Sequence, residues 1–368
     1  MKVCICHDYM NKKGGGERLV INLARALKAD IYTGFIDKKK TFDVSGLKIV
    51  SLGVNKNLPH IMRNMRIAKS FEKYKFPKYD IYIFSGVWCI SAAKNCKPNI
   101  LYLHTPPRFL YDLKYYFLNK MNPVEKVFFK KFTNSWRMKD QLYMRQFDII
   151  CPNSENVRNR VKTYYGNDLY RKCKVVYTGI EIEKYKFKEF GDFYLSTSRL
   201  DELKRIDIII DAFRRMPNRK LIIVSSGPDE KRLKKRAKGC ENIQFLGAVS
   251  DEKLLDLYSS CRAVIVAAKD EDLGLAAIEA QAAGKPVLAV AEGGFLETIN
   301  EKTGIFFNPN YDSLMSAVEK CEEKFTKNQW NYRIIQRNVW KFDISNFVRK
   351  IKRIAEQLIN ENKFRKIK

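Results

Sequence analysis

Short apolar runs recur along the chain and alternate with longer segments in which apolar residues return every three or four positions. A short apolar run predicts a buried strand, and the longer period predicts a helix with one apolar face. Strands and helices in alternation are typical of parallel sheets covered by helices, so the pattern predicts an α/β protein. The expected strands are residues 2–6, 31–33, 47–52, 80–84, 99–103 and 148–152 in the first half, and 193–197, 221–225, 242–246, 264–268, 287–289 and 304–308 in the second.

The order of the elements repeats, which indicates two Rossmann-like domains. A charged, turn-like stretch at 186–192 is the expected linker, because a new strand and helix start directly after it. With 368 residues the chain is long enough for two domains with full cores. We therefore expect a first domain at 1–188, a second at 189–343, and an amphipathic, basic C-terminal helix at 344–368.

The segment from Val264 to Ala289 predicts a strand, a charged loop, an Ala-rich helix that opens at Gly274, and a second strand. The first backbone N–H groups of a helix lack intrahelical acceptors and lie at the positive end of the helix dipole. The N–H groups around Leu273, Gly274 and Leu275 can therefore hold a phosphate or sugar oxygen.

Two glutamates flank this helix start. Glu271 precedes the helix and Glu279 lies about one turn inside it. Helical side chains lean toward the N-terminus, so both carboxylates can face the same crevice. The helical neighbours of Glu279 are apolar, so its partner must come from elsewhere. From spacing alone, Glu279 is either a ligand-binding carboxylate or a solvated charge on an exposed face.

Two cations follow the first strand of the second domain. Arg199 and Lys204 are five residues apart across the expected turn at the end of 193–197. Two positive charges there can clamp a diphosphate leaving group, which needs charge stabilisation as it departs. The alternative is that both are ordinary surface charges.

The first domain has its own candidates at strand ends. His104 directly follows the strand 99–103 and precedes two prolines, at the edge where open α/β sheets place ligands. It is either a ligand-binding histidine or one hydrogen-bonded beside a rigid turn. Gly15 and Gly16 follow the first strand and precede a helix expected from Arg18. They either let the backbone approach a diphosphate or simply mark a turn.

The composition indicates that the protein has an anionic partner. The formal net charge of +28 indicates a membrane surface, a nucleic acid or phosphorylated substrates. Nine cysteines without a C-x-x-C pair, and an N-terminus without the apolar core of a signal peptide, lead us to expect a reducing, cytoplasmic location. The longest weakly charged run, 81–93, is too short for a bilayer span, so no transmembrane helix is expected.

Bases and aromatic residues alternate between 115 and 147, and a helix-spaced basic stripe runs from Arg63 to Lys75. This region is either a solvated helix pair or a surface that lies on an anionic membrane. The bases are spread along the chain and do not gather on one recognition helix, so we expect no nucleic-acid partner.

Several segments together resemble the family 4 retaining glycosyltransferases. Glu271 and Glu279 surround a Gly-Leu pair, and EAQAAGKPVLA and Gly293-Gly294-x-x-Glu297 follow. The RLxxxKxxD segment at 199–207 and the GGxE segment before the first helix are similar to the family's phosphate-binding loops. HTPPR at 104–108 resembles the bacterial O-antigen mannosyltransferase branch of this family.

The resemblance implies the GT-B fold, with two Rossmann-like domains that face each other across a cleft and a C-terminal helix that crosses back to the first. It also implies a role for each candidate. Glu279 holds the donor's ribose, and Arg199 and Lys204 hold its diphosphate. Glu271 and the Leu273–Leu275 backbone hold the transferred sugar, Gly15 and Gly16 approach the phosphates, and His104 contacts the sugar near the acceptor.

The implied reaction is transfer of a sugar with retention of configuration, most simply mannose from GDP-mannose, to a hydroxyl of a lipid-linked or polysaccharide acceptor in surface glycan synthesis. No metal or other cofactor is expected, because the helix start and the two cations supply the positive charge. We expect the protein to act at the cytoplasmic face of a membrane, as a peripheral protein on an anionic surface.

Four alternatives stay open. A UDP-sugar-dependent transferase of the same fold differs only in donor. Asp270-Glu271-Asp272 matches the D-x-D signature of metal-dependent transferases with a single domain, which a chelator would inactivate. A nucleotide-sugar epimerase would need no acceptor. A basic nucleic-acid-binding protein would bind strands with a steep salt dependence.

Overall fold

Two six-stranded parallel sheets organise the chain, one in each of two units. The computed structural model describes residues 1–367, with side chains through Phe364. The first unit contains residues 1–178 together with the chain from 347 onward, and the second contains 179–346. No helix within residues 1–367 is both long enough and apolar enough to cross a membrane.

The first sheet has the strand order β3-β2-β1-β4-β5-β6. Chain connections run outward from β1 in one direction and from β4 in the other, which is the Rossmann order with its switch point between these two strands. Every residue of β1, β4 and β5 is buried, as expected for parallel strands covered on both faces. The strands are β1 (Val3–His7), β2 (Asp30–Thr33), β3 (Ile49–Ser51), β4 (Ile81–Ser85), β5 (Asn99–Leu103) and β6 (Ile149–Pro152).

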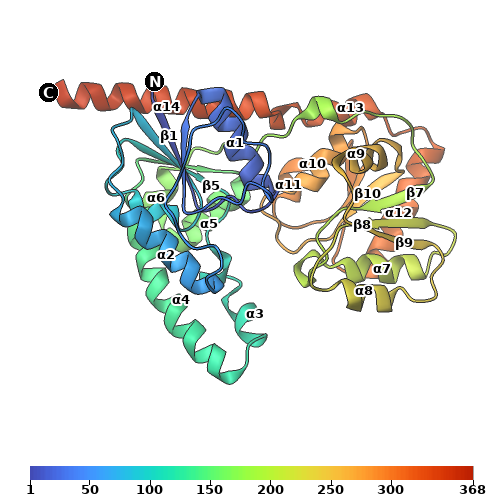
Figure 1. Cartoon of the computed structure of the whole chain (residues 1–368). Coiled ribbons are helices and arrows are strands. Elements are labelled where there is room, and N and C mark those ends of the chain that lie inside the picture. Colours follow the sequence, from blue (N-terminus) through green and yellow to red (C-terminus); the bar gives the residue numbers. More distant parts are fainter. Residues whose placement is uncertain (368) are drawn as a thin grey trace. The chain divides into compact units, whose positions relative to one another are not determined.

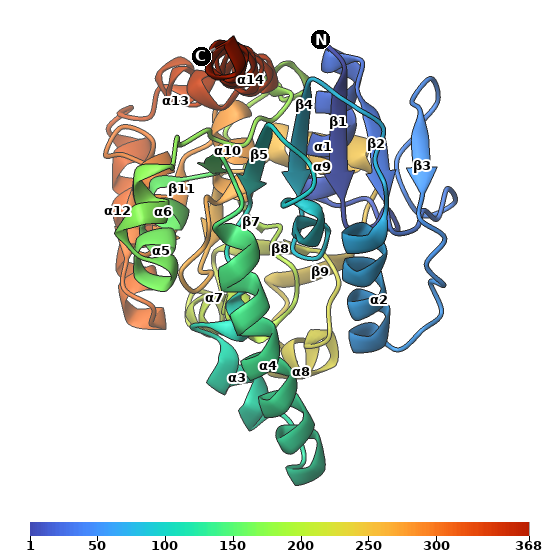
Figure 2. The same ribbon diagram turned by 90° about the vertical axis from the view of Figure 1, so that its left-hand side faces the viewer.

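Helices connect these strands, and two of them form an extension. Figures 1 and 2 show α4 extending well beyond the first sheet, with α3 beside its far part. Helix α4 begins with a reciprocal cap in which Asn122 and Glu125 each accept a backbone N–H of the other. The helices of this unit are α1 (Gly15–Leu27), α2 (His60–Lys73), α3 (Lys114–Asn119), α4 (Pro123–Met144), α5 (Glu155–Tyr165) and α6 (Asn167–Arg171), with 3₁₀ turns η1 (Cys89–Ala92) and η2 (Arg108–Leu110).

The second sheet repeats the same order as β12-β11-β10-β7-β8-β9, with its switch point between β7 and β10. Its strands are β7 (Phe193–Ser196), β8 (Lys220–Val224), β9 (Ile243–Gly247), β10 (Ala263–Val266), β11 (Val287–Val290) and β12 (Gly304–Phe307). Its helices are α7 (Ile206–Arg214), α8 (Glu230–Arg236), α9 (Asp251–Ser260), α10 (Leu275–Ala282), α11 (Phe295–Thr298), α12 (Tyr311–Thr326) and α13 (Tyr332–Asn338), with 3₁₀ turns η3 (Ile182–Lys184), η4 (Glu202–Lys204) and η5 (Trp340–Phe342).

The division between the units falls after Thr178, ten residues before the boundary expected at 188. Hydrogen bonds explain the difference: the Ile180 N–H donates to the Phe342 carbonyl at 2.9 Å, and the Ile344 N–H donates to the Ile180 carbonyl at 2.9 Å. Further along, the Phe187 ring stacks on Tyr332 at 4.2 Å between centroids. The segment after Thr178 is thereby attached to the second unit.

The last helix, α14 (Ile344–Ile367), contributes its residues from 347 onward to the first unit. Within that unit the Phe347 ring packs edge-on against Tyr102 of β5, with 5.0 Å between centroids. The Tyr102 hydroxyl also lies 2.8 Å from the Thr178 hydroxyl. Thr178 ends the first segment of this unit and Phe347 begins the second, so both segments contact the same buried tyrosine. Residue 368, the last of the expected C-terminal helix, lies outside the described residues.

Candidate functional site

The carboxyl edge of the second sheet gathers most of the sequence-predicted residues at its switch point. Thr197 follows β7, and Glu271 follows β10 in a loop that ends at the start of α10. The Lys204 ammonium lies 2.5 Å from Glu271 Oε2, and the two side chains are 27% and 23% exposed. The structure therefore brings together a cation and a carboxylate that are 67 residues apart in sequence.

Glu279 is partly buried on α10 and has a hydrogen-bond partner from α9. The Tyr258 hydroxyl donates to Glu279 Oε2 at 2.9 Å, and it lies 2.8 Å from the Thr197 hydroxyl. Since the single Tyr258 proton goes to the carboxylate, the Thr197 hydroxyl donates to Tyr258. Burial and the Glu279 charge raise the pKa of Tyr258 well above its usual value, which keeps this donor protonated. Glu279 is thus an oriented carboxylate and not a fully solvated charge.

Arg199 is more exposed than Lys204 and pairs with a different carboxylate. Its side chain is 69% exposed, and its Nε lies 3.9 Å from Asp201 Oδ2. Such a distant, exposed ion pair fixes the guanidinium weakly. Arg199 is therefore an exposed, weakly held cation, and the two-cation clamp of Arg199 and Lys204 stays a prediction.

The backbone at the start of α10 is held by three glycines. Gly274 has φ +88°, and a Cβ there would lie 2.7 Å from the Phe295 ring. A Cβ on Gly294 would lie 2.4 Å from the Leu273 Cα, and the Gly294 N–H donates to the Glu271 carbonyl at 2.8 Å. A Cβ on Gly293 would lie 2.5 Å from that same carbonyl oxygen. The backbone at Gly293 and Gly294 thus contacts the backbone of residues 271–273 directly, and this contact fixes the N–H groups from Leu273 onward.

A second carboxylate, missed from the sequence, anchors this loop. Glu292 accepts from the Arg205 guanidinium at 2.9 Å and from the Asp270 N–H at 3.1 Å. Arg205 and Asp270 have φ of +50° and +46°, a left-handed conformation that non-glycine residues adopt at a cost. One carboxylate therefore stabilises two strained residues that flank Lys204 and Glu271. The position of Glu292 shortly after the expected strand 287–289 is the sequence signal that could have identified it.

The first unit assembles a different group, also at its switch point. His7 ends β1 and Ser85 ends β4, and the His7 Nδ1–H donates to the Ser85 carbonyl. The Ser85 hydroxyl lies 2.9 Å from His104 Nε2. A Cβ on Gly16 would lie 3.9 Å from the His104 ring and 4.0 Å from the His7 ring. His7 and Ser85, which the sequence analysis left out, thus connect the predicted His104 and Gly16.

The electrostatics of this group keep His104 neutral. Burial and the neighbouring His7 ring lower the pKa of His104 to about 4. A neutral imidazole has one N–H donor and one acceptor nitrogen. His104 can therefore bind a hydroxyl near neutral pH without a net charge.

The glycines of the first loop are not in a turn. Helix α1 begins at Gly15, so Gly15 and Gly16 form its first turn, and Gly14 is the cap residue with no side-chain hydrogen bond. The expectation of a glycine-rich turn with a helix from Arg18 was wrong by three residues. The prediction began the helix too late because glycine has a poor helix propensity. The free-energy cost of glycine is small at a helix start, where the first N–H groups have no intrahelical acceptor in any case.

Two charged residues of the HTPPR-x-x-x-D segment, Arg108 and Asp112, form an ion pair with each other. The Arg108 guanidinium donates to Asp112 Oδ2 through Nη2 at 2.6 Å and through Nε at 2.9 Å. The Arg160 guanidinium donates to the Thr105 hydroxyl at 2.7 Å. These contacts hold the segment that carries His104.

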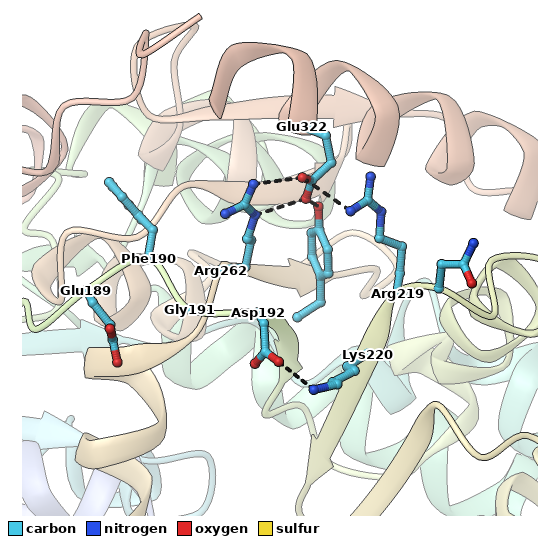
Figure 3. Close-up of a pocket in the computed structure, with 10 residues that line it drawn as sticks. Glu189, Phe190, Gly191, Asp192, Arg219, Lys220, Arg262 and Glu322 are labelled. Atoms are coloured by element: carbon cyan, nitrogen blue, oxygen red, sulfur yellow. Dashed lines mark hydrogen bonds and ion pairs between the residues drawn. The ribbon is translucent and has the colours of Figure 1, made fainter. Parts of the chain in front are cut away.

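The hollow drawn in Figure 3 lies at the opposite, amino-terminal edge of the second sheet and has a volume of about 600 Å³. Its cations are paired: Arg262 binds both oxygens of Glu322 at 3.0 and 2.7 Å, and Arg219 approaches the same carboxylate at 3.4 Å. Lys220 lies 2.5 Å from Asp192. Because each cation already has a carboxylate, this hollow is a poor phosphate site.

Comparison with known proteins gives the family. Residues 179–337 match the model described as "Glycosyl transferases group 1", and residues 13–184 match the one described as "Glycosyltransferase Family 4". Together the two models span both units. The chain is a glycosyltransferase of the group 1 and family 4 type.

Two curated relatives differ in how much of them this glycosyltransferase covers. Sulfoquinovosyl transferase SQD2 of Arabidopsis thaliana is 28% identical over 134 residues, which are 35% of this chain and 25% of the relative. Alpha-1,3/1,6-mannosyltransferase ALG2 of Dictyostelium discoideum is 24% identical over 366 residues, covering 83% of this chain and 86% of the relative. The chain thus spans a quarter of SQD2 but most of ALG2.

Among solved structures, Anabaena HepE in complex with UDP-glucose superposes with a TM-score of 0.75 at 18% identity, covering 97% of this chain and all of HepE (100%). This likeness concerns the fold. It confirms the expected α/β architecture of GT-B type with two Rossmann-like domains.

Proposed function

We propose that this glycosyltransferase is a retaining enzyme that moves mannose from GDP-mannose to a hydroxyl of a lipid-linked or polysaccharide acceptor. The observation that carries the proposal is the grouping of Lys204, Glu271 and the oriented Glu279 at the switch point of the second sheet. This edge is where open α/β sheets bind nucleotides. The similarity to ALG2, a mannosyltransferase over most of the chain, supports mannose as the sugar.

Each residue of the second unit has a chemical role in this proposal. Tyr258 orients the Glu279 carboxylate by donating to one of its oxygens. The oriented carboxylate accepts hydrogen bonds from the two ribose hydroxyls. Lys204 binds the diphosphate, with Arg199 as an exposed cation that closes on it. The N–H groups of Leu273, Gly274 and Leu275, at the positive end of α10, bind phosphate or sugar oxygens.

The Lys204–Glu271 ion pair links binding of the donor's diphosphate to binding of the transferred sugar. Without ligand, the ammonium and the carboxylate neutralise each other at 2.5 Å. When a diphosphate takes over Lys204, Glu271 becomes an acceptor for hydroxyls of the transferred sugar. The bond between the anomeric carbon and the diphosphate then breaks, a bond to the acceptor oxygen forms on the same face, and the departing diphosphate takes the acceptor's proton.

The first unit supplies a neutral binding group in this proposal. Ser85 engages His104 Nε2 at 2.9 Å and fixes the orientation of the ring, so Nδ1 is the nitrogen that binds a hydroxyl. The adjacent Gly16 leaves space beside both imidazoles, because it lacks a side chain. Together with Gly15 it places the first N–H groups of α1 at the same edge, where they can approach a phosphate.

A peripheral position on the cytoplasmic face of an anionic membrane is also part of the proposal. The outer face of α4, opposite to the face that packs on the unit, carries several exposed apolar side chains. Among its exposed side chains, Phe128 is 70%, Met138 71% and Leu142 61% exposed. Lysines and arginines lie beside this stripe, and such a helix favours shallow insertion into an anionic surface.

A transfer assay tests the proposal. The protein is incubated with GDP-mannose or UDP-glucose, a panel of octyl glycosides as acceptors, and either EDTA or manganese. We expect a mannosylated product in EDTA, and a proton spectrum of that product showing the α configuration of the donor. A β product would contradict retention, transfer only with manganese would contradict metal independence, and product only from UDP-glucose would replace the donor.

A further inference from the structure

The first unit has a groove between α2 and α4 that the proposed transfer does not use. It has a volume of about 460 Å³, and its apolar lining includes Met62 and Met65 from α2 and Trp136 from α4. The two methionines are 53% and 46% exposed. Flexible, exposed methionines beside a buried aromatic ring are suited to an alkyl chain. A second hollow, of about 520 Å³, lies along α2 and is lined by Leu52 and Tyr74.

Three cations line both hollows. Arg66, Lys69 and Lys73 are exposed and follow one another at single-turn spacing on α2. Lys56 nearby pairs with Asp37 at 2.8 Å, but none of these three forms an ion pair within residues 1–367. A row of cations without carboxylate partners between two hollows suits an anionic ligand, because charge-assisted hydrogen bonds are the strong ones.

The remaining polar residues leave the groove positive. Lys139 also lines it, with its ammonium 5.5 Å from the centre of the Trp136 ring. Glu72 is its acidic residue and is engaged by Tyr143, whose pKa is raised by burial and by this hydrogen-bonded carboxylate. Four cations against one carboxylate favour an anionic ligand.

Trp136 supplies a largely buried aromatic side chain to the groove. The side chain is 4% exposed, and its buried Nε1–H has no acceptor among the described residues. A buried donor without an acceptor is costly. The Trp136 side chain lines the groove beside the two methionines, where an alkyl chain can pack against it.

We propose that the α2–α4 groove is a binding site for one anionic phospholipid molecule. The phosphate lies against Arg66, Lys69 and Lys73, and one acyl chain lies along Met62 and Met65. This goes beyond a general attraction to anionic membranes, because such a site saturates at one lipid per protein and exists without a bilayer.

Short-chain lipids below their micelle-forming concentration test the site. The chain has four tryptophans, whose indole N–H signals can be followed by nuclear magnetic resonance, and Trp136→Phe identifies the signal of interest. We expect dihexanoylphosphatidylglycerol to shift this signal with one-to-one saturation. Dihexanoylphosphatidylcholine should bind at least tenfold more weakly, and glycerol 3-phosphate, which lacks the acyl chains, should not saturate.

Two triple variants with equal charge loss give the control. Arg66→Gln, Lys69→Gln and Lys73→Gln together should weaken lipid binding at least tenfold. Lys38→Gln, Lys39→Gln and Lys40→Gln, in an exposed loop after β2, should leave it unchanged.

Equal weakening by both triple variants would overturn the site in favour of general charge attraction. Tight binding of glycerol 3-phosphate would replace it with a free-phosphate site, and an unmoved Trp136 signal would remove it. Nucleotide-sugar binding, titrated separately on the same sample, reports on the proposed transferase activity independently of these outcomes.

Discussion

At the scale of single residues, Glu279 illustrates how a carboxylate is prepared for a ligand. A buried tyrosine donates to one of its oxygens and a threonine at the end of β7 donates to that tyrosine. The carboxylate is thereby held in one rotamer at the edge of the sheet. Its charge is only partly solvated, so a hydrogen bond from a ligand hydroxyl gains more than it would at the surface.

Glu279→Gln should weaken donor binding by roughly ten- to a hundredfold, since a charge-assisted hydrogen bond contributes about 1.5 to 3 kcal/mol. Tyr258→Phe keeps the charge and removes only the orienting donor, so its effect should be smaller. Calorimetric titration of GDP-mannose into the two variants measures both. Wild-type affinity in Glu279→Gln would show that the ribose role is wrong.

Asp140 on α4 is a second unusual carboxylate, 1% exposed. Tyr111 and Tyr165 donate to its Oδ2 at 2.6 and 2.8 Å, while Oδ1 has no partner among the described residues. Burial raises its pKa from 3.8 to about 6. Because the folded pKa is the higher one, its stabilising contribution is present below pH 3.8 and is lost as pH rises through 6.

Asp140→Asn removes this titration. Relative to the variant, the wild type should lose roughly 2 to 2.5 kcal/mol of unfolding free energy between pH 4 and pH 8, since one pKa unit corresponds to about 1.4 kcal/mol and part of the shift is already lost at pH 4. Urea unfolding of both proteins at several pH values, followed by tryptophan fluorescence, gives the difference. A difference that does not change with pH would mean that Asp140 titrates normally.

At the scale of elements, the contact between two loops sets the start of α10. The loop after β10 and the glycines after β11 touch backbone to backbone, so neither can move without the other. Glu292 adds a connection to η4, where Lys204 lies. The phosphate-binding N–H groups and the lysine are therefore parts of one rigid arrangement.

Gly294→Ala tests this contact. Gly294 has φ −65°, so alanine is not strained in its own backbone, but its Cβ would lie 2.4 Å from the Leu273 Cα. We expect a loss of stability of about 1 to 3 kcal/mol, as for other overpacked sites, and weaker donor binding. Gly16→Ala is the matched control, because its Cβ meets nothing nearer than 3.9 Å, and thermal unfolding should show little loss there.

The same contacts show what the sequence could predict. The strands 99–103 and 304–308 agree with β5 and, within a residue, with β12, because short apolar runs between turn residues are a local signal. The pairing of Lys204 with Glu271 joins residues 67 apart, and that of Tyr258 with Glu279 joins residues 21 apart. Such pairings depend on strand order, so the candidates could be named from the sequence while Thr197 and Tyr258, which carry no local signal, could not.

At the scale of the whole molecule, the charge of +28 is distributed over a protein whose proposed donor and partner surface are both anionic. Exposed charges act over about 8 Å at physiological salt, so a surface must come close before they contribute. The apolar stripe of α4 among its lysines provides that close approach in the proposal.

Sedimentation with vesicles tests the membrane proposal. Binding should appear with anionic lipid, weaken as salt rises, and diminish when Lys126, Lys130, Lys131 and Arg137 become glutamine, because each base near the surface contributes roughly 1 kcal/mol. Phe128→Ser should also weaken it without changing the charge. Equal, negligible sedimentation with anionic and neutral vesicles would remove the membrane partner and leave glycosyl transfer intact.

The central claim is that the second unit binds a nucleoside diphosphate sugar through Lys204 and Glu279. Calorimetric titration in EDTA with GDP-mannose, UDP-glucose, GDP and UDP tests it most directly, with Lys204→Met as the variant that keeps the side-chain length and removes the charge. We predict one-to-one binding of GDP-mannose that weakens at least tenfold in Lys204→Met. Failure of every nucleotide sugar to bind, or unchanged affinity in Lys204→Met, would contradict the account.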